Sequence, residues 1–198
     1  MNIGVDLDGV IFDSERVFWV YAQFFDMFEN GKGIKYPKEL RAQQRYDWSA
    51  EQKAKFEKAC PNIQKIAQVA PFAKQVLQAL KEKHKIYIIS SRGIMHKSEI
   101  SISKQRLQEE GIPFDKIIFK AKNKLEECQK LKIDLMIDDF YDTIFHLAKN
   151  NIKCLYYCDI STKKIKHKNV VNVKTWGDIA IQLVKKGIIS KDDIKGLT

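Results

Sequence analysis

Short apolar runs alternate with longer segments of helical spacing along most of the chain. Six runs are rich in β-branched or aromatic residues, and each is predicted to be a strand. They are residues 3–7, 86–89, 114–119, 135–137, 152–157 and 170–173. Helices are expected near 97–110, 122–131, 140–150 and 175–187, and another, opening at Pro71, carries Phe72, Val76, Leu77 and Leu80 on one face.

This alternation predicts an α/β fold. Strands that are apolar throughout and separated by helices are typical of a parallel sheet covered on both faces. Right-handed crossovers then give a doubly wound, mainly parallel, Rossmann-like sheet. Such sheets bind ligands beyond the carboxyl ends of the strands, where the strand order reverses. The residues that directly follow each run are therefore the candidates for function.

Residues 14–70 interrupt the alternation. They contain no convincing strand; Val17, Tyr21, Phe24 and Phe28 follow helical spacing, 51–59 is predicted to be helical, and Gly31, Gly33 and Pro37 mark a loop. We predict that 14–70 is a small helical cap, inserted after the first strand of a core domain made of 1–13 and 71–198. Most of the cap's aromatic residues should form its own small core: Phe18, Trp19, Tyr21, Phe24, Phe25 and Trp48.

Charged and hydroxyl residues follow four of the predicted strands. They are Asp6-Leu7-Asp8-Gly9-Val10, then Ser90-Ser91-Arg92, then Lys120, Lys122 and Lys124, and finally Asp138-Asp139. The fold should bring these groups to one edge. Carboxylates gathered so closely require a cation, and oxygen ligands without His or Cys favour Mg²⁺. Beside such a site, a hydroxyl and a lysine suit phosphate, and an aspartate can act as a nucleophile in phosphoryl transfer.

In this order, Asp6-Leu7-Asp8-Gly9-Val10, Ser90, Lys124 and Asp138-Asp139 resemble the four motifs of the haloacid dehalogenase (HAD) superfamily of phosphatases. The resemblance implies that Asp6 attacks phosphorus and binds the metal. Asp8 would protonate the leaving oxygen, later activate water, and bind the metal through its backbone carbonyl. Ser90, with Ser91, and Lys124 would hold phosphate oxygens, and Asp138 and Asp139 would complete the magnesium site. Lys124 is preferred over Lys120 and Lys122 because it precedes the helix leading into the fourth strand.

Three features refine the resemblance. After the paired acids, where the superfamily often has a Ser-Pro-Glu-Asn-like stretch, this chain reads Phe140-Tyr141-Asp142-Thr143, so Asp142 could substitute in supporting the metal site. Residues 86–93 and 124–139 resemble the branch of 5′(3′)-deoxyribonucleotidases and their bacterial relatives. In this superfamily an insertion after the first motif covers the catalytic edge. We therefore hypothesise that Arg92 helps to orient substrate and that one or two of Phe18, Trp19, Tyr46 and Trp48 face it.

Composition narrows the class of protein. The 198 residues, 44% of them apolar, fit one globular domain with a modest insertion. The net charge is +10, but the lysines are dispersed, which favours solvated faces over dedicated nucleic-acid binding. No run approaches the ~18 apolar residues of a membrane span, and no secretory signal is visible. Cys60, Cys128, Cys154 and Cys158 suit buried thiols rather than disulfides or zinc, so a cytoplasmic protein is expected.

These observations predict a Mg²⁺-dependent phosphomonoesterase with an aspartyl-phosphate intermediate, in the first place a 5′-nucleotidase acting on (deoxy)nucleoside monophosphates. A phosphatase for a sugar phosphate or phosphoamino acid is the alternative, and the charge also allows a phosphatase of nucleic-acid ends. A signalling receiver domain shares the acids, hydroxyl and lysine, but there the lysine comes last and no insertion follows the first strand. A non-catalytic module is disfavoured by the presence of Asp6, Asp8, Ser90 and Lys124 together. The oligomeric state is not fixed by the sequence.

Overall fold

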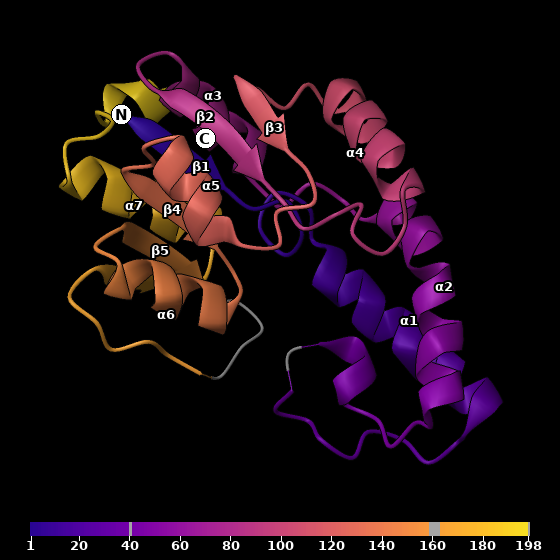
Figure 1. The fold of residues 1–198 in the computed structure, drawn as a ribbon. Coiled ribbons are helices and arrows are strands. Elements are labelled where there is room, and N and C mark those ends of the chain that lie inside the picture. The colour runs from indigo at the N-terminus through magenta and orange to yellow at the C-terminus, as the bar shows by residue number, and fades with distance from the viewer. Residues whose placement is uncertain (40, 159–162, 198) are drawn as a thin grey trace.

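The computed structural model describes residues 1–39, 41–158 and 163–197. Its strands form one sheet in the order β3-β2-β1-β4-β5-β6, and every neighbouring pair is parallel (Figure 1). The strands are β1 (Asn2–Val5), β2 (Lys85–Ile89), β3 (Lys116–Ile118), β4 (Leu135–Asp138), β5 (Lys153–Tyr157) and β6 (Val170–Val173). The predicted doubly wound α/β class is confirmed.

Helices connect the strands and form the insertion. They are α1 (Ser14–Glu29), η1 (Ala42–Gln44), α2 (Ala50–Ile66), α3 (Ala73–Lys81), α4 (Ser98–Glu109), α5 (Lys124–Lys130), α6 (Tyr141–Lys149), α7 (Trp176–Lys185) and η2 (Asp192–Leu197). The helix expected to open at Pro71 begins at Ala73 instead. Phe72 has a left-handed backbone (φ 66°), a conformation that no α-helix can include, so Pro71 lies in the preceding turn.

Both faces of the sheet are covered. On one face, side chains such as Val5 and Ile137 pack with α3 and α7, and on the other Met136, Cys154 and Tyr156 pack with α5 and α6 (Figure 1). Because neighbouring residues of a strand point to opposite faces, a sheet covered on both sides needs strands that are apolar throughout. This is the physical origin of uninterrupted apolar runs such as 86–89 and 135–137.

The strand order reverses between β1 and β4. The chain begins in β1, runs outward through β2 to β3, and then crosses to β4 on the other side of β1. Strands β1 and β4 pair from Ile3↔Leu135 to Val5↔Ile137, and the backbone N–H of Asp6 donates to the Ile137 carbonyl at 2.9 Å. The residues that follow these two strands therefore emerge side by side at the switch point, where doubly wound sheets bind their ligands.

The insertion has an apolar cluster of its own. Helices α1 and α2 lie side by side beyond the carboxyl edge of the sheet (Figure 1). With η1 they enclose Ala22, Phe25, Ala42, Tyr46, Trp48 and Phe56, against which Phe18, Trp19 and Tyr21 are partly buried. The indole Nε1 of Trp48 donates to the buried Asp26 carboxylate at 2.7 Å. The aromatic residues expected to form a core largely do so, while the division into a cap (14–70) and a core domain stays a prediction.

Helix α1 departs from the expected burial at two positions. Phe24 and Phe28 belong to the predicted helical stripe, yet they are 57% and 79% exposed. Phe25 and Ala22 are buried instead, against α2 and η1. Apolar residues occupy more than one side of this helix, so spacing alone identifies the helix but not the side that packs. Helix α2 also runs further than the expected 51–59, and it contains Pro61.

The helices and the cysteine side chains bear on whether the protein has membrane spans or disulfides. Among the helices of the described residues, none combines the length and apolar character that crossing a bilayer requires. Cys128, Cys154 and Cys158 are buried, and burial raises the pKa of the Cys128 and Cys154 thiols to about 12. The side chain of Cys60 lies outside the described part of the structure.

Candidate active site

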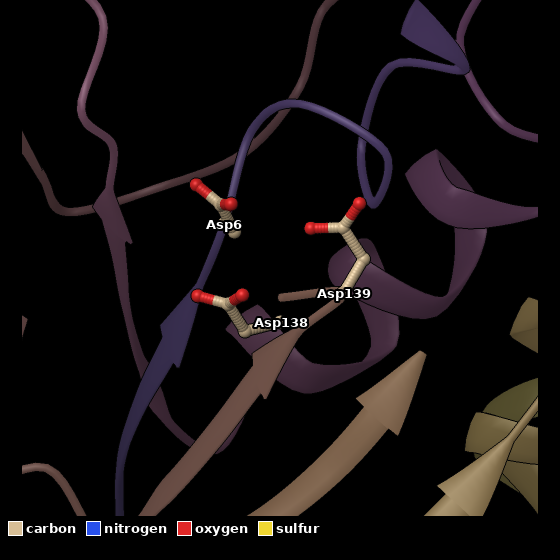
Figure 2. A group of neighbouring side chains, drawn as sticks. All are labelled: Asp6, Asp138 and Asp139. Atoms are coloured by element: carbon tan, nitrogen blue, oxygen red, sulfur yellow. The ribbon is translucent and has the colours of Figure 1, made fainter. Parts of the chain in front are cut away.

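Three carboxylates meet at the switch point. Asp6 directly follows β1, Asp138 ends β4, and Asp139 is the next residue. One oxygen from each lies within 4.8 Å of the others, and Figure 2 shows the three side chains gathered in the space beyond the two strands. Burial raises the pKa of Asp6 to about 7 despite the opposing charge of Lys124, and burial together with Asp138 raises the pKa of Asp139 well above its usual value. The group is therefore short of positive charge.

Lys124 is the cation that reaches this group. It is the first residue of α5, whose start is capped by the Asn123 side chain. Its Nζ lies 2.8 Å from Asp6 Oδ2 and 2.6 Å from Asp138 Oδ2. Although burial disfavours the charged amine, Asp138 and Asp6 together raise the pKa of Lys124. Of the three lysines considered for this role, Lys120 and Lys122 are exposed, and only Lys124 is held between two of the acids.

Asp8 has a different partner. Its Oδ2 and Oδ1 accept hydrogen bonds from Arg92 Nε and Nη2 at 2.7 and 2.6 Å. Arg92 is 3% exposed, and its Nη1 donates to Ser103 Oγ at 2.8 Å. Burial opposes ionisation of Asp8, but the guanidinium outweighs it and lowers the pKa of that carboxyl. The structure thus places Arg92 against Asp8, two residues after Asp6, and the Asp8 side chain is not among the three clustered carboxylates.

The two serines after β2 point differently. Ser90 is 1% exposed, and its Oγ accepts a hydrogen bond from the backbone N–H of Arg92 at 3.2 Å. Ser91 is exposed and lines the cavity above the carboxylates. Both hydroxyls were predicted to hold phosphate. Among the described residues, Ser91 lines the cavity and Ser90 does not.

A cavity of about 400 Å³ lies between the sheet edge and the insertion. Its floor contains the site residues Asp6, Asp8, Ser91, Lys124 and Asp139. Residues that face them from the insertion are Glu15, Phe18, Arg41, Ala42, Gln43, Phe56 and Gln64. The loops after β3 and β4 add Ala121, Lys122 and Phe140, and the first turn of α6 adds Thr143. The floor of the cavity thus carries the clustered acids with Lys124, while the insertion side combines aromatic, polar and charged side chains.

Of the four aromatic residues expected near a substrate, Phe18 is in the described lining. Trp19 is instead covered by the Arg45 guanidinium, 3.6 Å from the centre of its ring system. Tyr46 and Trp48 stack at 4.6 Å between ring centroids and are 3% and 4% exposed. These three side chains stabilise the insertion rather than face the cavity.

Several residues that line the cavity could not be identified as site residues from the sequence. Glu15 is in the first turn of α1, where acids are common, yet burial and the nearby Asp8 raise its pKa to about 8. The Arg41 guanidinium lies 4.8 Å from the ring centroid of Phe140, a contact between the insertion and the loop after β4. Gln64 looks like one of several polar residues of α2. Only the tertiary arrangement brings these residues together.

The charges of the site suit a divalent cation. The carboxylates of Asp6, Asp8, Asp138 and Asp139 are offset by Lys124 and Arg92, which leaves two negative charges uncompensated. Asp6, Asp138 and Asp139 offer hard oxygen ligands, and Mg²⁺ is bound through one or two carboxylates, waters and phosphate oxygens. Asp142, the proposed substitute, is exposed and outside this group. The donor set therefore fits Mg²⁺.

The Gly9 backbone makes room for Asp139. Gly9 has a φ of +70°, and a Cβ there would lie 2.0 Å from Asp139 Oδ2. We expect Gly9→Ala to displace this carboxylate, raising the Mg²⁺ concentration needed for half-maximal activity by at least about tenfold. Gly31→Ala is the matched control, because Gly31 has a similar φ of +65° but an open Cβ position. A magnesium titration of activity would contradict the expectation if the two variants behaved alike.

Comparison with known proteins supports this interpretation of the fold. No protein-family model matches the chain. A nucleotidase of Clostridium acetobutylicum is 23% identical over 107 residues, which are 54% of this chain and 54% of that protein, so the match spans about half the length of the curated relative.

Solved structures match over nearly the whole chain. A HAD hydrolase of Entamoeba histolytica is similar with a TM-score of 0.64 and 15% identity, covering 94% of this chain and 98% of that one. A HAD-type protein of Bacillus subtilis, solved with bound magnesium, has a TM-score of 0.62 and 13% identity, with 92% and 97% covered. A haloacid dehalogenase-like hydrolase of Streptococcus pneumoniae has a TM-score of 0.61 and 17% identity, with 91% and 97% covered. The resemblance to the HAD superfamily is confirmed at the level of the fold.

Proposed function

We propose that this chain, which has the fold of the HAD hydrolases, is a magnesium-dependent phosphomonoesterase that works through an aspartyl-phosphate intermediate. The observation that carries the proposal is the meeting of Asp6, Lys124, Asp138 and Asp139 at the switch point, with Asp8 beside them. An aspartate held against a cation and two further acids is suited to nucleophilic attack on a phosphoryl group. These residues come from three separate segments of the chain, after β1, at the start of α5 and at the end of β4, and the cavity above them admits a small molecule.

In the first step, an Asp6 carboxylate oxygen attacks the phosphorus of the bound monoester. The new bond joins Asp6 to phosphorus, and the bond from phosphorus to the ester oxygen breaks. Asp8 donates its proton to that oxygen, which leaves as an alcohol. Lys124 compensates the phosphoryl charge beside Asp6, and the Ser91 hydroxyl can donate to a phosphate oxygen.

In the second step, water attacks the phosphorus of the aspartyl-phosphate. Asp8, now ionised, accepts a proton from the water, and the bond between phosphorus and the Asp6 oxygen breaks. Inorganic phosphate leaves, Asp6 is again a free carboxylate, and Asp8 again carries the proton that the first step needs. When Asp8 is protonated, one of its oxygens can remain hydrogen-bonded to Arg92 while the other faces the substrate.

Magnesium would be held by Asp6, Asp138 and Asp139. When bound, it supplies positive charge that offsets the phosphoryl oxygens and the clustered carboxylates. The magnesium in the Bacillus subtilis relative supports this choice of metal.

We propose nucleoside and deoxynucleoside monophosphates as the substrates. Phe18 and Phe140 give the cavity apolar surface for a planar base, and Gln43 offers an amide group. The name of the Clostridium acetobutylicum relative supports the same class. Sugar phosphates and phosphoamino acids remain the second candidates, since the polar residues opposite the acids also suit them.

A panel of phosphomonoesters tests the function directly. It should contain nucleoside 5′- and 3′-monophosphates, sugar phosphates, phosphoserine and a DNA strand with a 3′-phosphate, each assayed for phosphate release with Mg²⁺. We expect release from the small monoesters, fastest from nucleotides, loss of activity in EDTA, and recovery when Mg²⁺ is restored. Absence of phosphate release from every compound would refute the phosphatase, whereas preference for the DNA end would refute the small-substrate assignment.

We expect Phe18 to contribute to substrate binding and Trp48 to contribute to stability. We expect Phe18→Ala to raise the KM for nucleotides about tenfold with little change in the unfolding midpoint, because Phe18 lines the cavity and is only partly buried in the insertion's aromatic cluster. Trp48→Ala should instead destabilise the protein by about 3–5 kcal/mol, since it empties a buried site and leaves Asp26 without the indole donor. Thermal unfolding and steady-state kinetics of both variants test this. The assignment is wrong if Phe18→Ala lowers the unfolding midpoint and Trp48→Ala raises only the KM.

A further inference from the structure

Asp8 stands at one end of a chain of buried polar contacts that begins in the insertion. Gln64, near the end of α2, donates from Nε2 to Glu99 Oε1 at 3.1 Å. Glu99, in the first turn of α4, accepts from the backbone N–H of Gly93 through Oε2 at 2.7 Å. Its backbone carbonyl accepts from Ser103 Oγ at 2.6 Å, and Ser103 Oγ accepts in turn from Arg92 Nη1 at 2.8 Å.

The contacts fix Arg92 from two directions. Ser103 holds the guanidinium, and Glu99 holds the backbone of the following residue, Gly93. The remaining guanidinium nitrogens, Nε and Nη2, grip both oxygens of Asp8. A bidentate pair of this kind sets the plane of the carboxylate as well as its position.

Because the members of this chain of contacts are buried, each depends on its hydrogen-bond partner within the protein. Gln64, Arg92, Glu99 and Ser103 are all less than 10% exposed, so none can exchange a lost partner for water without a rearrangement. Glu99 is a carboxylate and can only accept, which requires the Gln64 amide nitrogen to face it and leaves Oε1 turned away. That Oε1 has no hydrogen-bond partner among the described residues, and Gln64 also lines the cavity. The contact with α2 is therefore the member of the chain that a shift of the insertion would break first.

We propose that Gln64, Glu99 and Arg92 form a positioning network that anchors Asp8 at the cavity through the Arg92 guanidinium while α2 is seated against α4, so that protonated Asp8 can keep one oxygen on Arg92 and turn the other to the substrate. The inference rests on the proposed function, in which Asp8 protonates the leaving oxygen. It assigns to Gln64 and Glu99 the role of positioning residues that act on the reaction through Arg92. When α2 of the insertion packs against α4 over a bound substrate, Asp8 is aligned as the proton donor at the same time.

Leaving groups of different basicity provide the test. An alkoxide is a poor leaving group and needs a well-placed proton donor, whereas p-nitrophenolate leaves without one. The kinetic constant kcat/KM reports the steps up to departure of the alcohol, so it is sensitive to this difference. We would measure it for UMP, glucose 6-phosphate and p-nitrophenyl phosphate in the full-length protein with Mg²⁺. For Gln64→Leu, we expect at least a tenfold loss for the alkyl esters that the wild type hydrolyses and less than a twofold loss for p-nitrophenyl phosphate.

Arg106→Gln is the matched control. Arg106 also joins α4 to the end of α2, by donating to the backbone carbonyls of Lys65 and Ala67, but it has no contact with Arg92 or Asp8 among the described bonds. Any loss in this variant should be equal for aryl and alkyl esters, because Arg106 makes none of the hydrogen bonds that hold Arg92 against Asp8. Glu99→Gln serves as the second test variant, with the same selective loss expected, should Gln64→Leu fail to fold as judged by circular dichroism.

Each outcome decides the proposal. The proposal is supported if the network variants lose kcat/KM for the alkyl esters but not for p-nitrophenyl phosphate, and if Arg106→Gln shows no such difference between the two classes of ester. Equal loss for both classes of ester, or no loss, overturns it and leaves Gln64 as a packing residue. A wild-type protein that hydrolyses none of the three esters contradicts the proposed function itself, so the two failures are distinguishable.

Discussion

Asp6→Asn is expected to abolish phosphatase activity while leaving the protein folded. The amide has almost the same shape as the carboxylate, but it cannot form the aspartyl-phosphate and is a weaker metal ligand. Removal of a catalytic nucleophile costs several orders of magnitude in turnover, and we expect at least about a 10³-fold loss here. Phosphate release under saturating substrate and Mg²⁺ measures it.

The same variant should not be less stable than the wild type in EDTA at pH 8. The carboxyl's surroundings raise its pKa from 3.8 to about 7, so in the folded state the ionised form is disfavoured relative to the unfolded chain. A group with a raised folded pKa favours folding only where it is protonated, and at pH 8 the ionised Asp6 opposes folding. A neutral Asn removes that cost, and the midpoint of thermal unfolding should stay unchanged or rise.

Asp142→Asn is the control for Asp6→Asn. Asp142 is the second residue of α6, three residues after Asp139, but it is exposed and outside the carboxylate group. We expect nearly full activity. Activity above a tenth of the wild type in Asp6→Asn would reject Asp6 as the nucleophile, and loss in Asp142→Asn would restore its proposed part in supporting the metal site.

The fold could be predicted from the sequence because its sheet is covered on both sides. Runs such as 86–89 and 135–137 are apolar at consecutive positions, a pattern that parallel buried strands require. The prediction was less accurate where local conformation decides the boundary. Phe72 adopts a left-handed backbone that no spacing rule indicates, and it moves the start of α3 from Pro71 to Ala73.

The core of the site was predictable for a related reason. Parallel strands end at one edge, so acids after β1 and β4 had to be neighbours once the strand order was known. The orientation of each side chain was not predictable. Nothing in the local sequence indicates that Ser90 turns inward to the Arg92 backbone while Ser91 faces the cavity, or that Arg92 grips Asp8.

The insertion was the least predictable part. Its helices were expected from spacing, but α1 presents apolar side chains on more than one side, and Phe24 and Phe28 remain exposed. The cavity residues Arg41 and Gln64 resemble ordinary surface residues in the sequence. They come to the site only because α2 and the η1 loop are placed over the sheet edge, and this placement depends on contacts between residues far apart in the chain, such as Gln64 with Glu99.

Lys124→Met is expected to have the largest combined effect on activity and stability. Its Nζ is shared by Asp6 and Asp138, and its side chain is 10% exposed. Truncating one partner of a buried ion pair leaves uncompensated charge and costs about 3–5 kcal/mol. For a chain of this length, such a loss lowers the unfolding midpoint by roughly 6–20 °C. Turnover should also fall by at least about 10²-fold, because the cation that offsets the phosphoryl charge is lost.

Magnesium separates the two roles of Lys124. Excess Mg²⁺ should recover part of the stability of Lys124→Met, since the metal can compensate Asp6 and Asp138. It should not recover turnover, since the ammonium that lies against Asp6 is lost. Lys122→Met and Lys120→Met are the controls, both removing an exposed lysine of the same loop. Thermal unfolding with EDTA or Mg²⁺, beside phosphate release, would contradict the assignment if Lys124→Met kept its activity or if Lys122→Met lost more. In either case the phosphate-binding cation would be Lys122, which lines the same cavity, and Lys124 would serve only to stabilise the paired carboxylates.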